Sequence, residues 1–182
     1  MRKPIWLTAM MLFVMLGMLS GGQTIRAADP YTDPDGHFSF TPPGNYQQFT
    51  TQQVSDMFGV HSQNIVAYRA PFSTTNVSVG AVMLPDPNET VDDAVMAERD
   101  FLGSLDSFPI AFDDAQETML GSEPARSFEY ALSLNGVDLR GKQFVAVHNG
   151  AAYFITFTSL AASADRSFEE MQGIVDTFMF LD

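Results

Sequence analysis

The sequence predicts an α+β domain in which an antiparallel sheet, built as a meander of hairpins, carries helices packed on its faces. Two Asn-Gly pairs, at residues 135–136 and 149–150, each join segments that read as strands, a pattern typical of hairpins with two-residue turns. Two other segments, near residues 91–105 and 168–178, repeat apolar residues at helical spacing. Strands joined by two-residue turns are antiparallel, which excludes a parallel doubly wound sheet for this half of the chain.

The first half of the domain alternates short strands with breaks. Residues 37–41 alternate polar and apolar side chains, and the prolines and glycine at 42–44 end that strand. We expect a short helix around residues 53–58. Residues 65–70 and 77–84 are rich in β-branched and apolar side chains and are predicted to be strands.

A longer helix is expected to begin at Thr90. The Thr90 hydroxyl can cap the free backbone amides, and Asp93 suits the positive first turn. The apolar residues at helical spacing predict one buried face: Val91, Val95, Phe101 and Leu105. The acidic residues of the segment are expected on the solvated remainder: Asp92, Asp93, Glu98 and Asp100.

The second half of the chain predicts the meander itself. Short strands near residue 110 and at 117–120 precede longer strands at 127–134, 137–147 and 153–158. The alternation shifts phase near Gly141, which indicates a bulge. The strand at 153–158 is apolar or β-branched on both faces, so we expect it to be central and covered on both sides.

The C-terminal segment predicts a helix followed by a last strand. Ser167 and Glu170 have the spacing of a capping box, and an apolar stripe runs from Phe168 to Phe178. A short strand at residues 177–181 is expected to close the sheet.

The first 28 residues have the pattern of a secretory signal peptide. A basic start precedes an apolar stretch at residues 5–19, which is shorter than the roughly 20 residues of a membrane span. Cleavage is expected near Ala27 or Ala28, leaving residues 29–182 as a single domain outside the cytoplasm. A retained anchor or a buried helix is the alternative. The chain has no cysteine that could carry a lipid at the cleavage site.

The mature domain is strongly acidic. The chain has 9 basic and 22 acidic side chains, a net charge of −13. Three basic residues and no acidic ones lie in the signal segment, so cleavage changes the net charge to −16. This charge argues against binding to nucleic acid or to an anionic membrane surface, because both need clustered Lys and Arg.

Candidate chemistry is sparse. His37, His61 and His148 lack the helical spacing of metal ligands, and His148 is expected to be a solvated turn residue. Asp33 and Asp35, with Asp86 in another oxygen-rich loop, are weak candidates for calcium, although the EF-hand pattern fails around them. The sequence has no G-x-S-x-G, phosphate-loop or dinucleotide motif. We therefore expect that the protein is not an enzyme and that it binds no cofactor other than calcium.

The order of elements resembles the PsbP-like fold, shared by extrinsic proteins of photosystem II, by a Ran-GTPase release factor and by small exported bacterial proteins. Four groups of residues carry the resemblance: Phe38-Ser39-Phe40 with Pro43 and Tyr46; residues 121–125 leading to Phe128 and Tyr130; residues 149–153; and residues 168–178. The resemblance covers roughly residues 31–182. The usual tryptophan after the first strand is a tyrosine here. These are packing and turn motifs, so the resemblance implies a fold and no functional residue.

The function expected from these observations is that of an exported, non-catalytic binding or accessory domain. It would act outside the cytoplasmic membrane, docked on an envelope or membrane-complex protein or holding a small ligand. One alternative is an extrinsic, calcium-linked protein of photosystem II, which requires a photosynthetic host. Another is a hydrolase whose site gathers His37, His61 or His148 with carboxylates.

Overall fold

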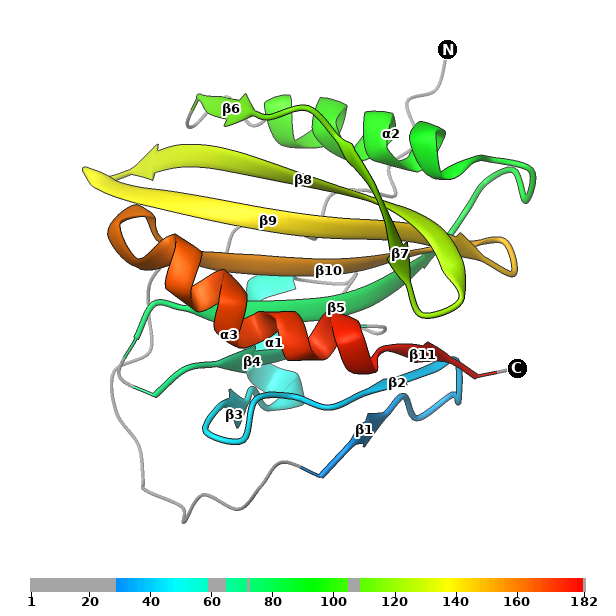
Figure 1. The fold of residues 1–182 in the computed structure, drawn as a ribbon, viewed down its shortest axis with the longest axis horizontal. Helices are drawn as coiled ribbons and strands as arrows, with labels where there is room; N and C mark the ends of the chain where they lie inside the picture. The colour runs from blue at the N-terminus through cyan, green and yellow to red at the C-terminus, as the bar shows by residue number, and fades with distance from the viewer. Residues whose placement is uncertain (1–28, 59–64, 72, 105–108, 182) are drawn as a thin grey trace.

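The computed structural model describes residues 29–58, 65–71, 73–104 and 109–181 (Figure 1). The segments expected to hold the signal peptide, His61 and Leu105 lie outside these residues. The elements, in chain order, are β1 (Tyr31–Thr32), β2 (Phe38–Phe40), β3 (Gln47–Gln48), α1 (Thr51–Phe58), β4 (Ile65–Arg69), β5 (Asn76–Met83), α2 (Val91–Gly103), β6 (Ile110–Phe112), β7 (Gln116–Leu120), β8 (Glu123–Leu134), β9 (Val137–His148), β10 (Ala151–Leu160), the 3₁₀ turn η3 (Ala161–Ser163), α3 (Ala164–Thr177) and β11 (Met179–Phe180).

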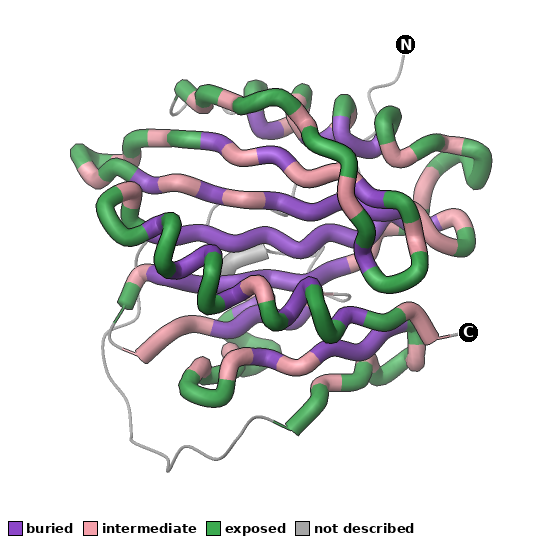
Figure 2. The backbone as a smooth tube through the Cα atoms, in the orientation of Figure 1, coloured by how far each residue is buried: buried purple, intermediate pink, exposed green. Residues whose placement is uncertain are grey.

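An eight-stranded antiparallel main sheet organises the described residues, which confirms the α+β fold class. Its order is β3-β4-β5-β10-β9-β8-β6, and β7 also pairs with β8. Helices α1 and α2 pack on one face and α3 on the other, so β10 is buried along nearly its whole length (Figures 1 and 2). None of the helices among these residues is long and apolar enough to span a membrane.

Both predicted Asn-Gly turns are present. Asn135 and Gly136 have φ of 51° and 79°, and Asn149 and Gly150 have φ of 47° and 74°. Positive φ at both central positions is the geometry of a type I′ turn, whose twist matches that of the flanking strands. The local sequence therefore determines the β8–β9 and β9–β10 hairpins.

The predicted bulge at Gly141 is wrong. β9 pairs without interruption on both sides, with Gly141 opposite Tyr130 on β8 and Thr158 on β10. A Cβ atom on Gly141 would lie 1.8 Å from Cζ of Tyr130. The glycine therefore makes room for the Tyr130 ring, and this close packing, not an extra residue, explains the break in the alternation.

The start of α2 is as predicted, but one of its acidic residues is not. Thr90 and Asp93 form a reciprocal capping box. Glu98, expected on the solvated face, is 1% exposed and lies between α2 and the sheet. Glu98 lies four residues after Ala94 and four before Leu102, so it falls on the same buried face of the helix as they do. Its position on the helix therefore buries it in spite of its charge.

The predicted capping box of α3 is also wrong. The helix begins at Ala164, so Ser167 lies inside it, and the Ser167 hydroxyl bonds those of Ser159 and Thr75. Glu170 instead accepts a hydrogen bond from Arg166 one turn earlier. The buried hydroxyl cluster ties the first turn of α3 to β10 and to the start of β5.

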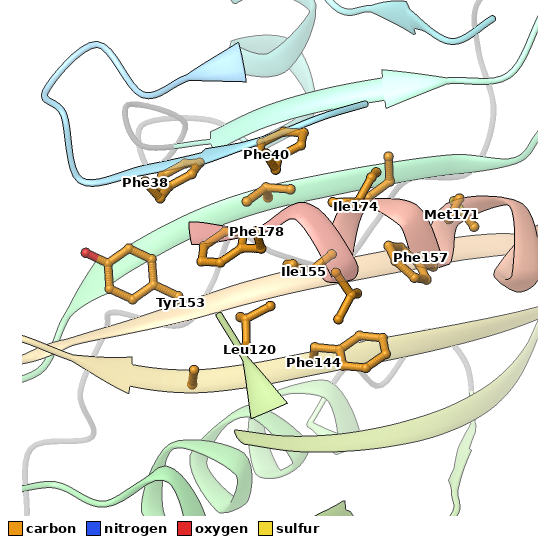
Figure 3. Close-up of a cluster of buried hydrophobic side chains, with 14 of the residues drawn as sticks. Phe38, Phe40, Leu120, Phe144, Tyr153, Ile155, Phe157, Met171, Ile174 and Phe178 are labelled. Carbon is orange, nitrogen blue, oxygen red and sulfur yellow. The ribbon is translucent and has the colours of Figure 1, made fainter. Parts of the chain in front are cut away.

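The last strand does not close the main sheet. β11 pairs with β2, and β1 pairs with the other edge of β2, giving a separate three-stranded sheet. Behind it lies a large aromatic core that joins this sheet, α3 and the main sheet (Figure 3). The ring of Phe38 stacks on that of Phe178, with 5.6 Å between the centroids, and meets the ring of Tyr153 edge-on, with 6.0 Å between the centroids.

Candidate functional site

The turn between β1 and β2 brings three potential metal ligands together. One ligand atom from each of Asp33, Asp35 and His37 lies within 4.8 Å of the other two. Gly36, at a φ of 78°, reverses the chain, and the His37 amide donates to Oδ2 of Asp33 at 3.2 Å. Two carboxylates and an imidazole form a mixed oxygen and nitrogen ligand set, which suits zinc and other transition metals better than calcium.

Asp86, the third predicted calcium candidate, belongs to a different loop. Its Oδ1 accepts hydrogen bonds from the backbone and the side-chain amide of Asn88, both at 2.9 Å. It therefore shapes the approach to α2 and is not part of the group at the β1–β2 turn. The imidazole of His37 joins that group instead, because the turn places it beside Asp33 and Asp35.

Tyr31 and Tyr153 lie close to this turn. Burial, followed by the charge of Asp33, raises the pKa of both phenols, and Asp35 adds to the effect on Tyr31. The Tyr153 hydroxyl points away from the aromatic core (Figure 3). The turn therefore places negatively charged carboxylates close to the rings of Tyr31 and Tyr153.

His148 is not the solvated turn residue that the sequence predicts. Its ring stacks on Phe180 at 4.4 Å, and Nδ1 lies 2.9 Å from Oε1 of Glu123. The Asn149 side-chain amide lies 3.0 Å from Nε2 and can donate to it, so a neutral ring would carry its proton on Nδ1 and donate to Glu123. Glu123 and His148 meet because the β8–β9 register, extended past Ala125 and Ala146, places them opposite each other.

A buried polar cluster lies under α2. Gln143 on β9 donates through Nε2 to Oε1 of Glu98 at 3.0 Å and to Oγ1 of Thr156 at 3.1 Å. Burial raises the pKa of Glu98 to about 7, against the lowering effect of the Gln143 hydrogen bond. Sequence reasoning missed this cluster, although the helical spacing of Val95, Glu98 and Leu102 was a signal for it.

The predicted histidines thus lie in separate settings. His37 is with Asp33 and Asp35, His148 is with Glu123, and His61 is outside the described residues. Three buried hydroxyls near the start of α3 are hydrogen-bonded to one another, those of Thr75, Ser159 and Ser167, and the exposed Ser163 bonds to Ser159. These bonds hold α3 on the sheet.

Comparison with known proteins gives a fold. No protein-family model matches the sequence, and no curated protein is significantly similar to it. Among solved structures, cyanobacterial PsbP (CyanoP) from Synechocystis sp. PCC 6803 is similar with a TM-score of 0.66 and 14% identity, over 90% of this chain and 98% of CyanoP. A point mutant of the protein Mog1 gives a TM-score of 0.58 and 8% identity, over 85% and 96% of the two chains. LpqN of Mycobacterium tuberculosis, described as involved in cell envelope biogenesis, gives 0.53 and 14%, over 85% and 90%.

These similarities place the chain in the class of PsbP-like α+β folds, as the resemblance in its sequence implied. At 8–14% identity they establish the architecture and do not transfer an activity or a partner.

Proposed function

We propose that this chain is an exported, non-catalytic accessory domain that docks on a basic surface of an envelope or membrane-complex protein. The observation that carries the proposal is the similarity to CyanoP and LpqN, each matched over at least 90% of its own length. The signal-peptide pattern supports export. The charge of the domain supports a basic partner.

The basic side chains of the described residues are already engaged within the domain. Arg126 pairs with Asp92 at 2.9 Å, and Arg140 and Lys142 both contact Glu129. The others lie against a carboxylate, a carbonyl or an aromatic ring: Arg166 on Glu170, Arg99 on the Asp113 carbonyl and Phe112, and Arg69 on Phe49. The surface therefore presents an excess of negative charge that suits a cationic partner.

Export is tested first, in the native host. A C-terminally tagged full chain should be recovered outside the cytoplasm at the mass of residues 28–182 or 29–182. A matched chain that begins at residue 29, with an added Met, should stay in the cytoplasm. Full-length protein recovered at unprocessed mass in the cytoplasm would contradict the proposal.

The partner surface is tested by carbodiimide crosslinking, which joins carboxylates to nearby lysines. We expect crosslinks from exposed carboxylates that form no ion pair among the described residues, such as Asp114 and Glu169, to lysines of an extracytoplasmic protein. D114K/E169K should lose the crosslinks, and D114N/E169Q should weaken the association less. Crosslinks that persist unchanged in the charge-reversed protein would contradict docking through this charge.

A further inference from the structure

The buried pair of Glu98 and Gln143 has more acceptors than donors. Both hydrogens of Nε2 of Gln143 are used, one on Glu98 and one on Thr156. Oε2 of Glu98 and Oε1 of Gln143 are buried and have no hydrogen-bond partner among the described residues. An ionised Glu98 leaves both oxygens unsatisfied, which is costly in a protein interior.

A cation could compensate an ionised Glu98, so the charges on the elements packed against α2 matter. The ionisable residues of β8 and β9 are Glu123, Arg126, Glu129, Tyr130, Asp138, Arg140, Lys142 and His148, and β6 has none. Strand alternation directs Arg126 and Tyr130 toward α2 and the other six toward the α3 face.

Neither of the two groups on the α2 face neutralises Glu98. Arg126 is held by Asp92 and Glu117 near the first turn of α2. Tyr130 is neutral, because burial raises the pKa of its phenol far above the physiological range. On the helix itself, Arg99 lies over Phe112 and Phe128.

We propose that Glu98 is a buried proton-binding site whose neutral form holds α2 on the sheet, and that losing this proton weakens the docking of α2. A protonated carboxyl supplies the missing donor. Its O–H can donate to Oε1 of Gln143 while its other oxygen accepts from Nε2, as in a cyclic acid–amide pair. One proton thereby satisfies both unpaired oxygens.

The sign of the pH dependence follows from the two pKa values. The pKa of Glu98 is about 7 in the folded protein, against 4.5 for an unperturbed group. Between these values the folded state holds a proton that the unfolded state has lost, so stability falls as pH rises and becomes level above about 7. A shift of this size corresponds to roughly a 300-fold change in the unfolding equilibrium constant.

The test compares wild type with E98Q in the chain that begins at residue 29. The glutamine amide donates at every pH, so E98Q should lose the part of the pH dependence between about 4.5 and 7. It should also protect the α2 amides from hydrogen exchange better than wild type at pH 8. D100N removes an exposed carboxyl on the same helix and should leave the wild-type dependence intact.

Two results would overturn the proposal. One is a wild-type pH profile in E98Q. The other is a Glu98 side-chain carboxyl that titrates near 4.5 by carbon NMR in the wild-type protein. The NMR titration needs no substitution at Glu98, so it decides the question even if E98Q fails to fold.

Discussion

Tyr130 lies across the space that a side chain at Gly141 would occupy. We therefore expect G141A to push the Tyr130 ring away from β9 and to destabilise the domain by about 1–3 kcal/mol, the usual cost of overpacking a core. Chemical denaturation followed by fluorescence of the tyrosines measures this. G173A is the matched control, because a Cβ on Gly173 in α3 meets nothing within 4 Å. Alanine favours helix by about 1 kcal/mol over glycine, so this variant should be stabilised. Equal effects of the two substitutions would contradict this reading of Gly141.

The β1–β2 turn predicts weak metal binding. Three solvent-accessible ligands, Asp33, Asp35 and His37, lie close enough to share an ion. We expect calcium affinity on the order of 10⁻⁴–10⁻³ M, as in extracellular modules, and tighter zinc binding because of the imidazole. Calorimetry should show heats that D33N/D35N abolishes and that D86N, in a separate loop, retains. The absence of binding heat at millimolar calcium or zinc would contradict the prediction of a metal site at this turn.

At the scale of elements, the short strand β11 and Phe178, the residue just before it, complete the aromatic core. Phe178 is 2% exposed and its neighbour Met179 is 57% exposed. We expect F178A to cost about 3–5 kcal/mol, the range for removing a buried phenylalanine. M179A should stay within about 0.5 kcal/mol of wild type. The paired denaturation midpoints test this, and a loss from F178A as small as that from M179A would contradict the role of the Phe178 ring.

Elements whose cause is local were predictable from the sequence. The two type I′ turns need only Asn-Gly, and the start of α2 needs only Thr90 and Asp93. Strand β10 was recognised as central because both its faces are apolar. Here local chemistry and tertiary packing favour the same structure.

Features that depend on distant partners were not predictable. Ser167 looks like a helix cap, but its hydroxyl is satisfied by Thr75, just before β5. His148 looks exposed until Phe180 and Glu123 are placed beside it. Glu98 looks solvated until the sheet supplies Gln143. In each case a polar group finds a partner far along the chain, which spacing alone cannot show.

At the scale of the whole molecule, the net charge of −16 carried by residues 29–182 works against compactness. The engaged basic residues leave the remaining carboxylates to repel one another. We expect the melting temperature at pH 7 to rise with NaCl up to about 0.2 M, since screening reaches a Debye length of ~8–10 Å in this range. Near pH 4.3, the pI of the full 182-residue sequence, most of this charge is neutralised and the same salt should have a smaller effect. A melting temperature that falls with salt at pH 7 would show that ion pairs such as Arg126–Asp92 outweigh the repulsion.

The small sheet joins the two ends of the domain, because β2 pairs with β1 at one edge and with β11 at the other. Ser39 and its partner Met179 are separated by about 140 residues, so this contact forms late in any chain made from its N-terminus. Until then Phe38 lacks the ring of Phe178 on which it stacks. A ribosome-released fragment that stops before residue 178 thus leaves the Phe38 ring partly uncovered, and chaperones or proteases that recognise exposed aromatic surface can separate truncated copies from finished ones.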